Sequence, residues 1–443
     1  MTRRVIVIGG GAAGMSAASA ARRADRSAEI TVLESGPFPS YGVCGLPYYL
    51  GGVIPDPQSL IAYPASEFRD RRKIDLQLET SVATVDLERQ RVVDSHGVMR
   101  EYDALVFAGG AAPIVPAITG VDDPRVVTIR RLDDAIDMHP RLDGARRGVV
   151  VGAGYVGLEM AEALHARGLE VTVLDRLPRV MTTVDAEVAE VIHEEASRHC
   201  RLILGAGLTG LRPGEAHMDV DYEGGTIPAD IVVLALGVRP STALVGSLAA
   251  LPNGALLVDD RMQTSDPHVF AAGDCAAVHH RVIGGPAYVP LGPAANKAGR
   301  VAGANAGGAD ARFPGVVGTA VVKVFDLIVA HTGLTEADAR TLGREPLVTQ
   351  VTAKSRAKYY PGAEPMLVRI VHERDGTVLG AQMAGRDGVA QRINVVAAAL
   401  QAGMGIEDLA DLDLAYAPPF SPVYDPLIQA AQAAVFSRQK EHA

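Results

Sequence analysis

Cys44 is the residue whose type and setting most clearly predict chemistry in this chain of 443 residues. It lies in a segment, residues 40–49, that is rich in glycine and contains a proline, and the other two cysteines, Cys200 and Cys275, are distant in sequence. The segment predicts a helix N-terminus at Cys44, a position that lowers the pKa of a thiol. A cysteine without a nearby partner can form a mixed disulfide with a small thiol, or be oxidised to a sulfenic acid. We interpret Cys200 and Cys275 as buried apolar residues.

Two glycine-rich loops predict two dinucleotide sites. The first loop, residues 9–14, follows an apolar strand and opens an alanine-rich helix, after which a second strand ends at Glu34. The same order recurs at residues 152–157, and its second strand ends at Asp175. Glycines allow a pyrophosphate to approach the helix N-terminus, and the acidic residue binds ribose hydroxyls. One such loop is a weak signal, but two in the same context strongly indicate two nucleotides.

The acidic residue of the second loop bears on which nicotinamide cofactor binds there. The carboxylate of Asp175 would repel a 2′-phosphate, which favours NADH over NADPH. Arg176 and Arg179 follow closely and favour the opposite choice, so NADPH remains an alternative.

Two later segments favour FAD at the first site. Asp274 follows Gly273 at the end of an apolar strand, where an aspartate can bind the ribityl hydroxyls of FAD. The alternative is that Asp274 is the N-cap of a following helix. Residues 291–296 are typical of a helix start, whose positive end could face the flavin or serve no ligand.

The order of the elements predicts three domains in an α/β fold with two Rossmann-like nucleotide-binding domains. The first is discontinuous, because the segment with Gly273 and Asp274 returns to it after the second glycine loop. From about Gly315 the pattern changes to β-type runs, an alanine-rich helix near residues 389–401 and a proline-rich segment, which predicts an α+β domain. We expect an FAD domain over 1–112 and 252–315, an NAD(P)H domain over 113–251, and a third domain over 316–443.

Composition excludes several classes of function. The chain is 48% apolar and 21% charged, with a formal net charge of −10, which argues against nucleic acid or an anionic membrane as the main partner. No apolar run reaches the roughly 18 residues of a membrane helix. Three cysteines fit a reducing cytoplasm. No Cys-x-x-Cys motif supports a dithiol relay, and we interpret the pair His279–His280 as loop surface without a metal partner.

At these residues the chain resembles the pyridine nucleotide-disulfide oxidoreductases over essentially its whole length. More narrowly, it resembles their single-cysteine branch, which comprises coenzyme A disulfide reductases, NADH oxidases and NADH peroxidases. The most specific matches are residues 40–48, 359–362 and 415–421, all similar to coenzyme A disulfide reductases. The resemblance implies that residues 316–443 form a dimerisation domain and that the protein is a homodimer.

The resemblance also implies a mechanism with FAD, NADH or NADPH, and coenzyme A. Electrons would pass from NAD(P)H through FAD to a Cys44–S–S–CoA mixed disulfide, and Tyr416 with Tyr359 or Tyr360 would reach the site from the partner subunit. The alternative for each tyrosine is packing at the dimer interface. By family position, the FAD site would comprise Gly9, Gly11, Ala12, Ala13, Gly14, Glu34, Ala108, Gly273, Asp274 and Ala294. The NAD(P)H site would comprise Gly152, Gly154, Tyr155, Val156, Gly157, Glu159, Asp175 and Gly237, with Tyr155 as a gate and Glu159 near the nicotinamide. The coenzyme A site would comprise Ser16, Arg23, Ser40 and Arg72.

One position discriminates within the branch. Oxidase and peroxidase members typically carry a histidine in the first glycine loop, where this chain has Ala12. This difference favours reduction of coenzyme A disulfide, or of a coenzyme A persulfide or polysulfide, over peroxide chemistry. Two alternatives remain open: an NADH oxidase or peroxidase that uses a Cys44 sulfenic acid, and a redox-sensing or electron-transfer flavoprotein in which Cys44 is incidental. For the arginines of the coenzyme A site, the alternative is a solvated basic face, and Arg22 and Arg71 are neighbours that could take their place.

Overall fold

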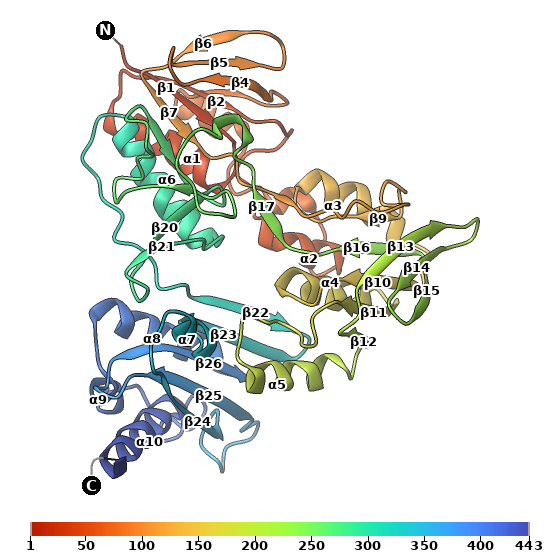
Figure 1. Cartoon of the computed structure of the whole chain (residues 1–443), viewed down its shortest axis with the longest axis vertical. Helices are drawn as coiled ribbons and strands as arrows, with labels where there is room; N and C mark the ends of the chain where they lie inside the picture. The colour runs from red at the N-terminus through yellow and green to blue at the C-terminus, as the bar shows by residue number, and fades with distance from the viewer. Residues whose placement is uncertain (1, 442–443) are drawn as a thin grey trace.

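The computed structural model describes residues 2–441 and forms three bodies, each built around its own five-stranded sheet (Figure 1). The N-terminus lies in the first body and the C-terminus in the third, at opposite ends of the long axis. Two of the sheets are parallel and the third is antiparallel. The predicted α/β fold with a C-terminal α+β unit is therefore confirmed.

The first sheet is parallel and has the order β19-β7-β1-β2-β3. The central strand β1 is buried on both faces. Val5 and Val7 pack with helices α1 and α6, whereas Ile6 and Ile8 on the opposite face pack toward the small sheet β4-β5-β6. This two-sided burial explains the continuous apolar run of the strand. The strands are β1 Arg4–Ile8, β2 Glu29–Leu33, β3 Asp75–Gln77, β7 Ala104–Phe107 and β19 Val269–Ala271, and the helices are α1 Ala12–Ala24 and α6 Gly292–Ala306. The small sheet comprises β4 Val82–Asp86, β5 Arg91–Asp94 and β6 Met99–Glu101.

The second sheet repeats this arrangement with the order β12-β11-β10-β16-β9. Its strands are β9 Val126–Val127, β10 Arg147–Val151, β11 Glu170–Asp175, β12 Arg201–Leu204 and β16 Ile231–Leu234. Its helices are α3 Leu132–Met138, α4 Tyr155–Ala166 and α5 Ala186–Ala196. An outlying sheet comprises β13 Leu208–Pro213, β14 Met218–Tyr222 and β15 Gly225–Ala229, and β8 Ala111–Pro113 pairs with β17 Val238–Pro240 between the first two bodies.

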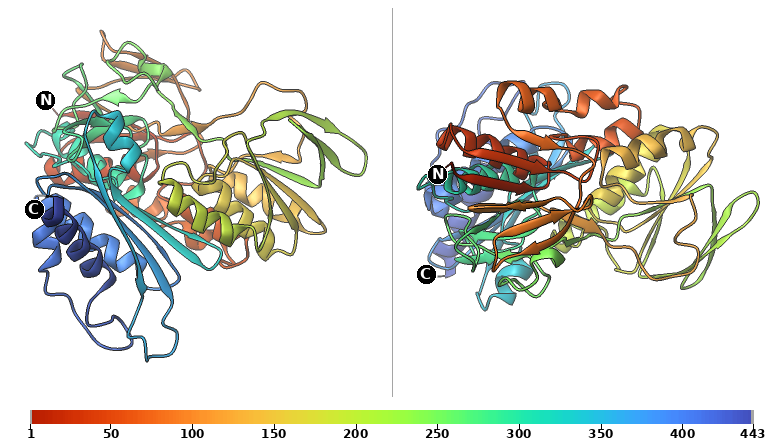
Figure 2. Two further views of the ribbon diagram at one scale, coloured as in Figure 1. Left: turned by 60° about the horizontal axis from the view of Figure 1, so that its bottom comes forward. Right: turned by 90° about the horizontal axis from the view of Figure 1, so that it is seen from above.

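The third sheet is antiparallel, with the order β22-β23-β26-β25-β24. In β25, Met366, Val368 and Ile370 face helices α8 and α10, while Leu367 on the other face packs into a core shared with the second body. Figure 2 shows these helices beside the sheet. The strands are β22 Ala320–Val324, β23 Leu327–Gly333, β24 Leu347–Lys354, β25 Pro365–His372 and β26 Val378–Gly385. The helices are α7 Glu336–Thr341, α8 Val389–Ala402, α9 Ile406–Ala410 and α10 Pro426–Glu441.

The segment after the second body returns to the first sheet, because β19 pairs with β7. It continues into β20, Ala276–His280, which lies between β18, Leu256–Leu257, and β21, Gly285–Ala287. The interpretation of His279–His280 as loop surface was wrong. Both residues belong to β20, and the alternation of side chains along a strand leaves His279 exposed and His280 buried.

Candidate active site

The first glycine loop has the geometry of a phosphate cradle. Gly9 has a φ of +100°, and a Cβ there would lie 2.3 Å from the carbonyl oxygen of Ala108. A Cβ on Gly14 would lie 1.8 Å from the carbonyl oxygen of Gly9, so the helix can start this close to the strand only with glycine. Beside Gly11 there is open space, and this N-cap residue offers no side chain to the first amides of α1. These amides are therefore free to bind an anion.

In both βαβ units, the acidic residue that follows the glycine loop at the end of the next strand accepts hydrogen bonds from backbone amides, one of them in the loop. Glu34 accepts hydrogen bonds from the amides of Gly10 and Gly36, and Asp175 accepts them from Ala153 and Leu177. Each carboxylate keeps further lone pairs for ribose hydroxyls.

The second loop has the same close contacts as the first. A Cβ on Gly152 would lie 2.3 Å from the Ala235 carbonyl oxygen, and one on Gly157 would lie 1.9 Å from the Gly152 carbonyl oxygen. Gly154, like Gly11, has open space beside it. Both loops therefore fit a dinucleotide.

The other residues expected at FAD lie around the first loop. A Cβ on Gly273, whose φ is +85°, would lie 2.9 Å from the Cβ of Ala13 and 3.9 Å from that of Ala295 in the first turn of α6. Asp274 is followed by β20 and not by a helix, so it is not an N-cap. Its carboxylate instead forms an ion pair of 2.7 Å with Arg130. Sequence reasoning missed Arg130, because the segment after β9 carries no motif that would indicate it.

The Cys44 segment is attached to the first loop by hydrogen bonds. The amide of Ser40 donates to the carbonyl oxygen of Gly10 at 2.8 Å, and that of Gly42 donates to Leu60 at 2.9 Å. Cys44 then lies in a single 3₁₀ turn, Val43–Gly45, which leads into the short helix α2, Leu46–Leu50. Leu46 is fully buried in the core shared by the second and third bodies. The segment that carries the thiol is therefore anchored against the second body through α2 and α4, and Cys44 itself is exposed.

The expected lowering of the Cys44 pKa was wrong. Although the side chain reaches the surface, the surrounding protein displaces water and raises the pKa of the thiol, and the charges of Glu159 and Asp274 raise it further. Arg130 acts in the opposite direction. Burial also raises the pKa of Glu159 to about 7, with a second contribution from Glu162. The prediction considered only the local turn, whereas these charges come from distant segments.

The other two cysteines are buried, as expected, and Cys44 is the exposed one. The Sγ of Cys200 donates to the carbonyl oxygen of Ala196, and that of Cys275 lies near the carbonyl oxygens of Phe107 and Ala272. Because both are buried, a disulfide formed by the exposed Cys44 would need a thiol from outside the chain.

The tyrosines lie in the third body. The hydroxyls of Tyr359 and Tyr416 are 3.3 Å apart, whereas Tyr360 lies near Arg356, whose guanidinium carbon is 6.0 Å from its ring centre. Tyr359 and Tyr416 are 77% and 47% exposed. Within residues 2–441 of one chain, neither tyrosine forms a hydrogen bond with Cys44.

The residues expected at coenzyme A differ in exposure and in how many partners their side chains already have. Arg23 is exposed, and the Ser16 hydroxyl donates to Asn296. Arg72 is engaged by Glu67 and Ser19 and lies over the rings of Tyr63 and Phe68.

Of the two neighbours that could replace these arginines, Arg22 donates to four backbone carbonyl oxygens and has a structural role. Arg71 points outward and pairs with Glu67. Arg23 is therefore the arginine of this group best placed to meet a phosphate.

The NAD(P)H candidates gather at the start of α4. Tyr155 is its first residue; burial raises the pKa of its hydroxyl, and the nearby side chain of Thr183 acts in the opposite direction. Its ring centre lies 6.3 Å from that of His331 in β23. Val156 is exposed in the same turn, and Gly237, with a φ of +92°, lies between β16 and β17.

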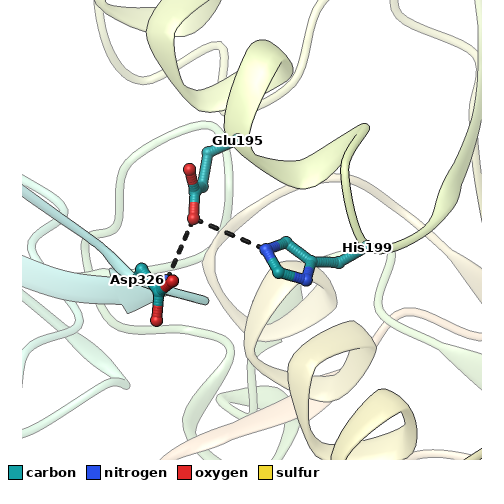
Figure 3. Close-up of side chains that lie close together, drawn as sticks. All are labelled: Glu195, His199 and Asp326. Carbon is teal, nitrogen blue, oxygen red and sulfur yellow. Dashed lines mark hydrogen bonds and ion pairs between the residues drawn. The ribbon is translucent and has the colours of Figure 1, made fainter.

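Among the described residues, the side chains of Glu195, His199 and Asp326 are close enough to share a metal ion (Figure 3). Glu195 already forms ion pairs of 2.7 Å with Arg198 and 2.8 Å with Arg386. These cations neutralise the carboxylate, and we interpret the group as a contact between α5 and the turn after β22. In the part of the chain that the structure describes, no helix is both long and apolar enough to cross a membrane.

Comparisons with known proteins identify a family and relatives that share this fold. The family model of the pyridine nucleotide-disulphide oxidoreductases matches residues 3–299, and the model of their dimerisation domain matches residues 319–427. The NAD(P)H coenzyme A polysulfide/persulfide reductase of Pyrococcus horikoshii is 39% identical over 98% of this chain and 99% of its own. The coenzyme A disulfide reductase of Staphylococcus aureus is 29% identical over 94% and 96%. The water-forming NADH oxidase of Lactobacillus brevis, solved with NADH, has a TM-score of 0.96, 31% identity and full coverage of both chains.

Proposed function

The chain belongs to the pyridine nucleotide-disulphide oxidoreductase family, and on that premise we propose that it reduces disulfides or persulfides of coenzyme A through Cys44. Members of this family are oxidoreductases that use FAD and NAD(P)H, and this chain carries their dimerisation domain. The observation that carries the proposal is the exposed, unpartnered thiol of Cys44 in a segment hydrogen-bonded to the first dinucleotide loop.

The cofactors would be held by the two loops described above. The amides at the start of α1 and the carboxylate of Glu34 suit FAD, and the amides at the start of α4 and the carboxylate of Asp175 suit NAD(P)H. When bound, FAD would supply the electron pair, taken from NAD(P)H, that reduces a disulfide at Cys44.

Cys44 would act as the nucleophile. Its thiolate attacks one sulfur of coenzyme A disulfide, the S–S bond breaks, and Cys44–S–S–CoA forms while a coenzyme A thiolate departs and takes up a proton. With a coenzyme A persulfide the same mixed disulfide forms and hydrosulfide departs. Two electrons and one proton then release coenzyme A as the thiol and regenerate the Cys44 thiolate.

The departing thiolate needs a proton donor, and the Tyr359–Tyr416 pair is suited to this role from the partner subunit. A tyrosine hydroxyl is protonated at neutral pH, and the hydrogen bond with Tyr359 raises the pKa of Tyr416 further. The geometry favours Tyr359 over Tyr360 as the partner of Tyr416. Arg23, Ser16 and Ser40 would contact the coenzyme A moiety.

The mass of the intact purified protein tests this proposal. If Cys44 holds coenzyme A, treatment with a thiol reductant should remove one coenzyme A adduct per chain, and the protein should reduce coenzyme A disulfide with NADH. The similarity to the NADH oxidase supports a second candidate, oxygen reduction through a Cys44 sulfenic acid. If the FAD-loaded protein carries no adduct and consumes oxygen faster than it reduces coenzyme A disulfide, the second candidate is favoured and our proposal is contradicted.

Exchange of Arg176 for alanine should raise the KM for NADPH about tenfold and leave the KM for NADH nearly unchanged. Arg176 and Arg179 are exposed beside Asp175, and among the described residues neither has an ion-pair or hydrogen-bond partner for its guanidinium. Steady-state kinetics with both nucleotides would show this. Arg201→Ala, at the start of the neighbouring strand β12, is the control. We expect the unmodified protein to prefer NADH, and a strong preference for NADPH would contradict the role assigned to Asp175.

Exchange of Glu159 for glutamine should lower the pKa of Cys44, because the charge of Glu159 raises it. Alkylation of Cys44 by iodoacetamide, followed by intact mass, should therefore be faster in this variant above about pH 7, where Glu159 is ionised. Below that pH, Glu159 is protonated in the unmodified protein and the two rates should converge. Equal rates across the pH range would show that Glu159 does not act on the thiol.

A further inference from the structure

Asp185 occupies the N-cap position of α5 but does not cap its own helix. An aspartate at this position ordinarily accepts hydrogen bonds from the second or third amide of the helix. Here the carboxylate is 7% exposed and turns instead toward the third body, where it accepts from Arg369 at 3.1 Å, from the side-chain amide of Gln382, and from the backbone amide of Glu336 at 3.2 Å.

The third sheet presents these partners as a matched pair. Arg369 in β25 and Gln382 in β26 lie directly opposite each other in the register, on the face that does not contact α8 and α10. They are 5% and 1% exposed. The side-chain oxygen of Gln382 also accepts from the backbone amide of Asp185 at 2.7 Å, so the contact holds both the side chain and the backbone of this residue. We call this group of Asp185, Arg369 and Gln382 the interbody clamp.

The clamp holds the end of a short segment, residues 178–185, that reaches the candidate nicotinamide site. Within the segment, the amide of Met181 donates to the carbonyl oxygen of Ala153 in the second glycine loop at 2.8 Å. Met181 is buried with a φ of +43°, a conformation that costs free energy outside glycine and must be stabilised by its surroundings. Two residues further on, the side chain of Thr183 lies near enough to Tyr155 to lower the pKa of its hydroxyl. Tyr155 also packs against the core cluster that contains Val180, Met181 and Val184 of this segment.

We propose that the interbody clamp positions the side chain of Tyr155 for pyridine nucleotide binding, through the segment 178–185 and Thr183. Asp185, Arg369 and Gln382 are positioning residues in this scheme, because none of them lies at the glycine loop itself. The third body would thus contribute to the nucleotide site of its own chain, in addition to dimerisation. The inference depends on the proposed NAD(P)H site at Tyr155 but not on the chemistry of Cys44.

A second contact of the same kind provides an internal control. Glu195, near the C-terminal end of α5, also reaches the third body, where it accepts from the backbone amide of Asp326 (Figure 3). It also pairs with Arg386. It resembles Asp185 in being a buried carboxylate that contacts both an amide and an arginine of the third body. It is about ten residues along the helix, roughly 15 Å from Asp185, and does not belong to the segment that carries Thr183.

Titration calorimetry with NAD⁺ on the purified FAD-loaded protein tests the proposal. Asp185→Asn should raise the Kd for NAD⁺ about three- to thirtyfold, and Thr183→Val should have a similar effect. The double variant should bind no more weakly than the weaker single variant, because both changes act on one chain of contacts. The control Glu195→Gln should change the Kd less than about twofold. Hydrogen exchange at residues 178–185 should become faster in Asp185→Asn only.

An unchanged Kd in folded Asp185→Asn would overturn the proposal, as would an equal effect of Glu195→Gln, which would indicate loss of general docking. If Asp185→Asn fails to fold, Thr183→Val tests the proposal instead. Thr183 is exposed, and this substitution only replaces its hydroxyl by a methyl group, so the variant should fold. Reduction of ferricyanide with NADH does not require Cys44, so the same variants can be measured in that assay even if coenzyme A disulfide is not the substrate.

Discussion

Replacement of Cys44 by serine should lower the turnover of coenzyme A disulfide by about a thousandfold or more, while the transfer of electrons from NADH to ferricyanide stays within about threefold. The substitution removes the sulfur that forms the mixed disulfide, and it leaves both glycine loops and their acidic residues unchanged. A serine hydroxyl is nearly isosteric but cannot form or accept a disulfide. Kinetics with the two electron acceptors on the same preparation would separate these effects.

Cys200→Ser is the matched control for this experiment. Its thiol donates to a backbone carbonyl within α5 and the following turn, and a serine hydroxyl can make the same hydrogen bond. This variant should retain coenzyme A disulfide turnover. If Cys44→Ser retained it as well, the covalent mechanism would be wrong; if Cys44→Ser also lost the ferricyanide reaction, the variant would report damage to the flavin site and not the loss of a nucleophile.

The glycine loops could be predicted from sequence because the constraints on them are local. Gly14 and Gly157 lie against a carbonyl oxygen of their own loop, at distances that no Cβ permits, so the motif itself contains the information. The strands of the two parallel sheets could be predicted equally well, because burial on both faces produces short, continuous apolar runs in the sequence. The domain boundaries stay predictions.

The properties of the candidate site that depend on distant segments could not be predicted. The pKa of Cys44 is raised partly by Glu159 and Asp274, which reach it only because α4 packs against α2 and β19 pairs with β7. In the same way, Tyr359 and Tyr360 are adjacent in sequence and equivalent as residue types, and only the path of the chain brings Tyr359 to Tyr416. Asp185 stands at the start of α5, and nothing in its local sequence indicates its contact with the third sheet.

The tyrosine pair leads to the second prediction of a large effect on coenzyme A disulfide turnover. Exchange of both Tyr359 and Tyr416 for phenylalanine should reduce coenzyme A disulfide turnover about tenfold to a thousandfold, because the departing thiolate loses its proton donors. The ferricyanide reaction should be unaffected. Both residues are exposed in the single chain, so the loss of two hydroxyls should leave the fold and FAD content intact.

Mixed dimers would show which subunit supplies these hydroxyls. Co-refolding or co-expression of Cys44→Ser chains with Tyr359→Phe/Tyr416→Phe chains combines two inactive proteins. If the tyrosines act on the Cys44 of the partner subunit, each mixed dimer contains one intact site, and random mixing should restore about a quarter of the unmodified activity. If they act within their own chain, every site in the mixed dimer carries one defect, and activity should stay at the level of the separate variants. Differently tagged chains, purified for both tags, should then show about half of the unmodified activity, because every dimer in that sample is mixed and has one working site.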